Sequence, residues 1–464
     1  MRTERRRVEI DKSQGCYRVL HTADWHLGKM LGERHRDEEH RRFLAWLLET
    51  LCSEEVDALI IAGDLFDSAR PPQSAVRQYY EFLASLYHLR RGSCRVIVTA
   101  GNHDSPAHLD APREILKALS ATVVGELPAT LEDAVVPLPD AENPALIVAA
   151  IPFLRDRDLR TGVLGENADE IRNNLRAGIA NCYARAATAC VRPQWSQAAR
   201  LAVGHLTVQG AKSSDSERDI HIGGLGAVGT EVFPSCFDYV ALGHLHRPQV
   251  VGGSDRVCYS GSPIPLSFGE SQDVKSVRIV DFADGQRIAN CRLEVPNFRT
   301  LSQVKCRRPE LEETLRGVSL PSADLTTWVE LLVSTADSAE NLNEVIREIS
   351  PDLPFEIARV IALAASETAS LAEADVALDS AEALLSNPID VFNHLLDQQV
   401  DFTDDELLGL RTAFAELRDL ELASRDEDGA ASATGTAGAA NAASGRAESV
   451  VAGTVATDSD RNAT

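Results

Sequence analysis

The stretch HTADWHLG, residues 21–28, decides the fold, because it places a carboxylate and an imidazole directly behind an apolar run. Asp24 and His26 stand two residues apart, and residues 17–20 before them predict a buried strand. In open α/β sheets, binding sites gather at the carboxyl ends of strands. We therefore expect these two side chains to lie at the edge of a sheet, beside similar side chains from other strands.

Further apolar runs along the chain also end in polar side chains that can bind metal. In chain order these side chains are Asp64 and Asp67, then Asn102, His103 and Asp104, then His205, and finally His244 and His246. Between the first three runs, residues 37–55 and 72–91 carry apolar residues at helical spacing. Alternating strands and helices predict a parallel sheet with right-handed crossovers, at whose edge these segments converge.

The side chains gathered in this way are carboxylates, imidazoles and an amide, without a thiolate. These donors suit Mn²⁺, Fe²⁺ or Mg²⁺ better than a structural zinc ion. The candidate ligands are Asp24, His26, Asp64, Asn102, His205, His244 and His246. They are too many for one ion, so we predict two divalent ions ~3.5–4 Å apart, bridged by a carboxylate, as in enzymes that hydrolyse phosphodiesters.

Charge is divided unevenly along the 464 residues, whose net charge is −24. Residues 1–300 hold 39 acidic and 35 basic residues, whereas residues 301–464 hold 31 acidic and 11 basic residues. The near-neutral first part is compatible with a polyanionic substrate. Because strong binding to DNA needs many cations, we expect a partner to supply some of them.

Cysteine usage and hydropathy indicate the compartment. The 9 cysteines are scattered without a CxxC pair, which is typical of reduced thiols in a cytoplasmic protein. No apolar run approaches the length of a membrane span, and the basic start MRTERRRVEI is not followed by the apolar region of a secretory signal. The sequence therefore predicts a cytoplasmic protein.

A chain of this length is expected to form about two or three domains. We expect an N-terminal extension over 1–16, a first domain over 17–285, a small strand–helix–strand domain over 286–365, and helices over 366–423. The tail, 424–464, has almost nothing large to bury and is expected to be disordered. The apolar stripe of the helices is compatible with a core or with a partner-binding surface.

The order D-x-H, GDxxD, GNHD, H and GHxH resembles the calcineurin-like metallophosphoesterase superfamily. Within it, GHLTVQGAKSSDSERDIHIGG (204–224) and YSGSPIPLSFGE (259–270) look like the SbcD family of nuclease subunits. The likeness covers residues 17–282 and weakens through 300–420. It implies an α/β fold, with a β-sandwich flanked by helices, a small α+β capping domain and C-terminal helices.

The resemblance also implies a role for each site residue. One ion would be held by Asp24, His26, Asp64 and His246, and the other by Asp64, Asn102, His205 and His244. His103 would contact the phosphate, stabilising the transition state or protonating the leaving 3′ oxygen. Asp67 would orient His103, as in related phosphatases. Archaeal nucleases carry a histidine at that position, so Asp67 could instead be a capping or surface acid in the loop before Pro71.

The activity implied by the resemblance is Mn²⁺-dependent. It is an ATP-dependent 3′→5′ exonuclease on duplex ends and an endonuclease on single strands and hairpins, in DNA recombination, replication and repair. The implied partner is SbcC, an SMC-like ATPase bound by the C-terminal helices, in a complex of two nuclease and two ATPase subunits. One alternative is a phosphatase or cyclic-nucleotide phosphodiesterase of the same superfamily. Against it, protein phosphatases carry GDxxDRG and GNHE, where this chain has GDLFDSAR and GNHD. A scaffold without catalysis is disfavoured because every ligand position is filled.

Overall fold

A computed structural model describes residues 12, 15–159, 168–214, 216–217, 227–318, 323–335 and 342–364. The predicted helices over 366–423 and the tail over 424–464 lie outside the described residues. Among the helices of the described ranges, none combines the length and the apolar character that a membrane span requires. All 9 cysteines are free thiols.

The first of two six-stranded sheets contains the strands that precede the predicted ligands Asp24, Asp64 and Asn102. Its strand order is β14 (Gln286–Glu294), β13 (Ser276–Ala283), β1 (Tyr17–Thr22), β4 (Ala58–Ala62), β5 (Arg95–Thr99) and β6 (Ala121–Val124). Strands β1, β4, β5 and β6 are parallel, and β13 and β14 run antiparallel at one edge. The predicted parallel arrangement of β1, β4 and β5 is confirmed.

The second six-stranded sheet contains the strands that lead to the remaining histidines. Its order is β11 (Gln249–Val251), β12 (Val257–Tyr259), β10 (Tyr239–Gly243), β9 (Ala199–His205), β8 (Leu146–Ala150) and β7 (Val135–Leu138). The four inner strands are parallel, and β11 and β7 are antiparallel edge strands. His205 is the last residue of β9, and His244 directly follows β10.

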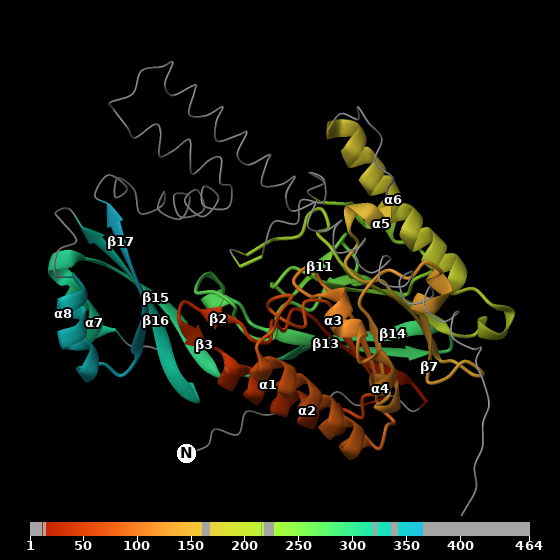
Figure 1. The fold of residues 1–464 in the computed structure, drawn as a ribbon, viewed down its shortest axis with the longest axis horizontal. Coiled ribbons are helices and arrows are strands. Elements are labelled where there is room, and N and C mark those ends of the chain that lie inside the picture. Colours follow the sequence, from red (N-terminus) through yellow and green to blue (C-terminus); the bar gives the residue numbers. More distant parts are fainter. Residues whose placement is uncertain are drawn as a thin grey trace, which may run out of the picture. The chain divides into compact units, whose positions relative to one another are not determined.

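Side-chain alternation along β4 shows how the two sheets and the helices are layered. Leu59 and Ile61 pack against apolar side chains of α1 (Asp37–Ser53) and α2 (Gln73–Arg90), which lie side by side (Figure 1). Ile60 and Ala62 pack instead against the second sheet. Helix α6 (Ala168–Ala189) covers the other face of that sheet. The predicted β-sandwich flanked by helices is confirmed. The carboxyl ends of parallel strands in both sheets can therefore contribute residues to one site.

Shorter elements complete the first domain. They are β2 (Met30–Leu31), β3 (Arg34–His35), α3 (Pro106–Asp110), α4 (Arg113–Ala118) and α5 (Asp156–Leu159). Strand β14 pairs with β13, so the first sheet continues past the predicted boundary at residue 285 to Glu294. Asp284 and Gly285 both have positive φ. An Asp-Gly pair of this kind forms a tight hairpin turn, not a linker.

A smaller parallel sheet follows, with the order β15 (Arg299–Arg307), β16 (Leu325–Thr335) and β17 (Glu356–Ala364). Helices α7 (Leu311–Gly317) and α8 (Leu342–Ile349) contribute apolar side chains to its core, and both lie against one face of the sheet in Figure 1. The predicted strand–helix–strand unit corresponds to β16, α8 and β17. Strand β15 and helix α7 were not predicted.

His21 joins the two sheets behind the predicted site. Its Nδ1 lies 3.0 Å from the hydroxyl oxygen of Tyr239 in β10, and the side chain is fully buried. Burial, assisted by the nearby Arg278 cation, lowers the pKa of the imidazole to about 3. This position gives His21 a packing role between the two sheets.

The variant His21→Gln is expected to reduce the loss of stability in acid. The unfolded chain takes up a proton on His21 as the pH falls through about 6.5, whereas the folded protein does so only near pH 3. The stability that neutral His21 contributes is therefore present above pH 6.5 and lost as the pH falls. Between pH 7 and pH 5, the wild-type free energy of unfolding should drop by about 2 kcal/mol more than that of the variant.

Urea unfolding at a series of pH values measures this difference. The control variant Tyr239→Phe removes the hydroxyl but leaves the imidazole buried, so it should keep the wild-type pH dependence. Parallel profiles for the wild type and His21→Gln between pH 7 and pH 5 would contradict the prediction.

Candidate metal centre

The end of β9 and the loops after β1, β4, β5 and β10 bring the predicted ligands together. The imidazole of His26 lies against that of His246, with 5.0 Å between ring centroids, and the rings of His205 and His244 are 5.4 Å apart. Three groups have ligand atoms that all lie within 4.8 Å of one another. They are Asp24, His26 and His246, then Asp24, Asp64 and His205, and finally His26, Asp67 and His103.

Asp64 lies at the centre of this arrangement. Its Oδ2 atom is 3.5 Å from Nε2 of His26 and 3.4 Å from Nε2 of His205. Its Oδ1 atom accepts a hydrogen bond of 2.9 Å from the main-chain N–H of His103. One carboxylate oxygen is thus shared by imidazoles from both sheets, as expected of a residue that bridges two cations.

The other nitrogen of each imidazole is held by the protein. Nδ1 of His26 lies 3.1 Å from Oδ1 of Asp67, and Nδ1 of His205 lies 3.0 Å from the carbonyl oxygen of Ala62. Nε2 of His205 is also 2.9 Å from Oδ1 of Asn102. A neutral imidazole has a single N–H, so a proton on Nδ1 leaves Nε2 as an acceptor that faces other acceptors. A cation at this position would satisfy all of them.

Buried charge supports the same conclusion. Burial raises the pKa of Asp24 well above its usual value, and Asp64 raises it further. Burial also lowers the pKa of His205, but the Asp64 carboxylate outweighs burial and raises it to about 9. Without a metal ion, a proton on Nε2 therefore occupies the position between His205, Asp64 and Asn102 that a cation would take. Within the described residues, Oδ2 of Asp24 and Nε2 of His26 have no hydrogen-bond partner. Unpaired buried donors and acceptors are costly, and a divalent cation suits this set.

The remaining predicted residues also reach the site. Asp24 Oδ1 accepts a hydrogen bond of 2.8 Å from the main-chain N–H of His244, which joins the loop after β1 to the second sheet. The carboxylate of Asp67 contacts His26 and the Lys29 ammonium, each at 3.1 Å. Nδ1 of His103 lies 2.8 Å from the main-chain oxygen of Asp67.

The backbone of the site is strained. Asp24, His26, Asp64 and His244 all have φ between 46° and 98°, a region that residues other than glycine rarely adopt. Such strain persists where surrounding structure enforces it and gathers at functional sites. A Cβ atom on Gly101 would overlap the Asp64 carboxylate, so only glycine permits this approach. Side-chain patterns alone gave no sign of this strain.

Several supporting residues had no assigned role in the sequence. Asp104 Oδ2 accepts hydrogen bonds from the main chain at Leu65 (3.1 Å) and Gly101 (2.9 Å), and its Oδ1 accepts one from Phe66. Behind His246 lie Glu270, Lys275, Ser216 and Glu217. Glu270 ends the stretch YSGSPIPLSFGE, and Ser216 and Glu217 lie in 204–224. Metal binding alone does not require either stretch. Their likeness to the family was therefore the sequence signal that could have pointed to these residues.

The two helix-flanked sheets and the cluster of carboxylates and imidazoles define a calcineurin-like metallophosphoesterase. A family model described as calcineurin-like phosphoesterase matches residues 17–144. A second model, described as type 5 capsule protein repressor C-terminal domain, matches residues 297–400. Its start agrees with the end of β14 in the first domain.

Relatives of known function identify a family within this class. The chain is 38% identical over 341 residues to the SbcD subunit of the nuclease SbcCD from Escherichia coli K12, a match that covers 73% of this chain and 84% of the relative. It is 40% identical to the same subunit of Rhodobacter capsulatus over 66% of this chain and 76% of the relative. For Bacillus subtilis the identity is 34%, over 71% and 82%. The chain belongs to the SbcD family of nuclease subunits.

Proposed function

We propose that this protein is the nuclease subunit of an SbcCD-type complex and hydrolyses DNA phosphodiesters with two divalent cations. The observation that carries the proposal is the position of the Oδ2 atom of Asp64. It lies between Nε2 of His26 and Nε2 of His205, whose Nδ1 atoms are both held by other acceptors. Family membership supports the nuclease activity.

The donor set fits a pair of hard or borderline divalent cations, and we assign Mn²⁺ as the ion used. One cation is assigned to Asp24, His26, Asp64 and His246, and the other to Asp64, Asn102, His205 and His244. When bound, the pair supplies Lewis-acid stabilisation of the phosphoryl group and a water of lowered pKa. The protein fixes the donors through the contacts at Asp67, Ala62 and the main chain of His244.

His103 is assigned to the phosphate. Its main-chain N–H is bonded to the bridging Asp64, and its Nδ1 is bonded to the main-chain oxygen of Asp67. These two contacts hold the ring beside His26, with 4.7 Å between centroids. Because Nδ1 is hydrogen-bonded to the main chain, we assign Nε2 to a substrate oxygen, where the imidazolium form can donate a proton as the 3′ oxygen leaves.

Asp67 is assigned to His26 through its carboxylate and to His103 through its main chain. Asp67→Asn is therefore expected to weaken Mn²⁺ binding by about 10- to 100-fold, the usual effect of losing a partner that orients a ligand. The main-chain contact to His103 should persist. Titration of Mn²⁺ by calorimetry measures the effect. A variant with unchanged Mn²⁺ affinity and reduced cleavage would instead assign the carboxylate to His103.

The relatives are named as subunits of SbcCD, and we propose that SbcC, an SMC-like ATPase, is the partner. The proposed contact uses helices over 366–423, outside the described residues, in a complex with two copies of each subunit. The ATPase would supply cationic surface for DNA that the acidic C-terminal third lacks. The proposed activities are an ATP-dependent 3′→5′ exonuclease on duplex ends and an endonuclease on hairpins and single strands, acting in the cytoplasm.

Cleavage of a labelled DNA hairpin by the purified chain with Mn²⁺, with and without the ATPase and ATP, tests this function. A phosphomonoester and a cyclic nucleotide serve as competing substrates. Preferential hydrolysis of DNA supports the nuclease assignment. Hydrolysis of the phosphomonoester or cyclic nucleotide alone would favour the phosphatase alternative, and no hydrolysis in the complete complex would favour a scaffold.

A further inference from the structure

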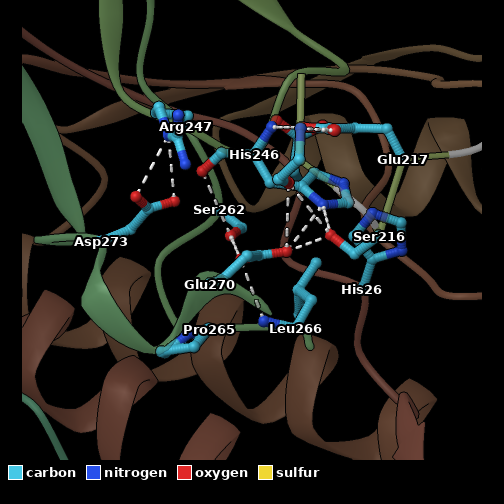
Figure 2. A network of polar contacts seen from close by, with 12 residues as sticks. His26, Ser216, Glu217, His246, Arg247, Ser262, Pro265, Leu266, Glu270 and Asp273 are labelled. Atoms are coloured by element: carbon cyan, nitrogen blue, oxygen red, sulfur yellow. Dashed lines mark hydrogen bonds and ion pairs between the residues drawn. The ribbon is translucent and has the colours of Figure 1, made fainter. Parts of the chain in front are cut away.

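A fully buried carboxylate lies behind His246, on the ring edge that carries Nδ1. Oε1 of Glu270 is 3.4 Å from Nδ1 of His246. The hydroxyl of Ser216 is 2.5 Å from the same nitrogen and also hydrogen-bonds to Oε1 of Glu270. Figure 2 shows Ser216, Glu270 and His246 meeting. The Nδ1–H of His246 therefore has acceptors on both Glu270 and Ser216.

A buried cation completes the arrangement. Nζ of Lys275 is 2.5 Å from Oε2 of Glu270 and 3.0 Å from the carbonyl oxygen of His246. Oε2 also accepts a hydrogen bond of 3.1 Å from the main-chain N–H of Leu266. Lys275 thus neutralises Glu270 and holds the main chain of His246, while Glu270 faces the imidazole. The ion pair therefore contacts both the main chain and the side chain of His246.

Stability alone does not account for this ion pair. Replacing a buried ion pair by apolar residues of similar volume is often neutral or stabilising. The pair of Glu270 and Lys275 is therefore better explained by its contacts with His246. His205 is oriented by a main-chain carbonyl, and His26 by Asp67, whose side chain is 25% exposed. His246 is held by a carboxylate that is entirely shielded from water. A carboxylate behind a metal-bound histidine fixes its tautomer and raises its basicity.

We propose that Glu270, held by Lys275, is a positioning residue that fixes His246 with Nδ1 protonated and Nε2 directed to a cation. This inference rests on the proposed function, in which His246 is a metal ligand. It predicts that affinity at one of the two Mn²⁺ sites depends on the ion pair. The other site, assigned to Asn102, His205 and His244 with Asp64, should not depend on it.

The test uses two variants of the full chain, Glu270→Gln and the double variant Glu270→Met/Lys275→Met. The double variant leaves no unpaired buried charge, so it separates a loss of orientation from a loss of folding. Both variants are expected to bind Mn²⁺ at one site with about 10- to 100-fold lower affinity and at the other with wild-type affinity. Isothermal titration with Mn²⁺ measures the affinities, and electron paramagnetic resonance distinguishes an isolated Mn²⁺ ion from a coupled pair.

Asp273→Asn is the matched control. Asp273 lies three residues after Glu270 and pairs with Arg247 at 3.1 Å, beside the same network (Figure 2). It should keep both wild-type affinities. If the double variant unfolds at the wild-type temperature without metal and binds two Mn²⁺ ions with wild-type affinities, the positioning role is overturned while the proposed function stands. If the wild type itself binds no Mn²⁺, the proposed function fails first.

Discussion

Replacing Asp64 by asparagine is expected to abolish both the binding of two Mn²⁺ ions and DNA cleavage. Asparagine keeps the shape of the side chain and can still accept the main-chain N–H of His103. It lacks the charged oxygen that lies 3.4 Å and 3.5 Å from the two imidazoles. Because this carboxylate is assigned to both cations, its loss should weaken both sites, unlike the loss of a ligand that serves one.

Thermal unfolding with and without Mn²⁺ measures this effect without relying on activity. Each site filled at a hundred times its Kd stabilises the folded state by about 2.7 kcal/mol. The wild type should therefore gain about 5 kcal/mol in saturating Mn²⁺, and Asp64→Asn should gain close to none. An Asp64→Asn protein that retains the full Mn²⁺-dependent shift would remove Asp64 from the bridging position.

Asp104→Asn is the matched control, because Asp104 is also a buried carboxylate and is hydrogen-bonded to the loop that carries Asp64. It accepts hydrogen bonds from three main-chain N–H groups. An amide nitrogen in place of Oδ2 would leave two of these donors unpaired, which costs about 1–3 kcal/mol each. The control should lower the unfolding temperature without metal and keep the Mn²⁺-dependent gain. The two aspartates thus separate metal binding from loop stability.

The metal motifs could be predicted from sequence because each is a local signal. An apolar run, a glycine and a carboxylate or histidine lie within a few residues, and the parallel arrangement of strands places such segments at one edge. This is why Asp24, Asp64 and Asn102, from three neighbouring strands, were expected to meet. The confirmed positions of β1, β4 and β5 follow from the same apolar runs.

The supporting contacts could not be predicted because they depend on which atoms face one another after folding. Asp67 illustrates this limit, since its carboxylate contacts His26 and its main chain contacts His103. Glu270 lies 24 residues from His246, in a loop without a periodic pattern. The turn at Asp284 and Gly285 looked like a domain boundary, although it closes a hairpin. Sequence composition specifies turns better than it specifies what a turn connects.

His103→Ala is expected to lower the rate of DNA cleavage by about 10²- to 10⁴-fold, the usual contribution of general acid–base catalysis. Alanine retains the main-chain N–H that binds Asp64, so the bridging carboxylate should keep its position. The substitution removes only the imidazole, which is not assigned as a ligand. Mn²⁺ affinity and DNA affinity should therefore remain within a few-fold of wild type while single-turnover cleavage is lost.

His108→Ala provides the control, because His108 is an exposed histidine five residues further along the same segment, on α3. It should cleave DNA at the wild-type rate. An unchanged single-turnover rate in His103→Ala would exclude the imidazole from the chemical step. A His103→Ala protein that no longer binds Mn²⁺ would instead place His103 among the ligands, beside His26 and Asp67, the residues with which its imidazole forms a compact group. The two measurements together therefore assign the residue to proton transfer or to metal binding, because each role predicts a different pair of results.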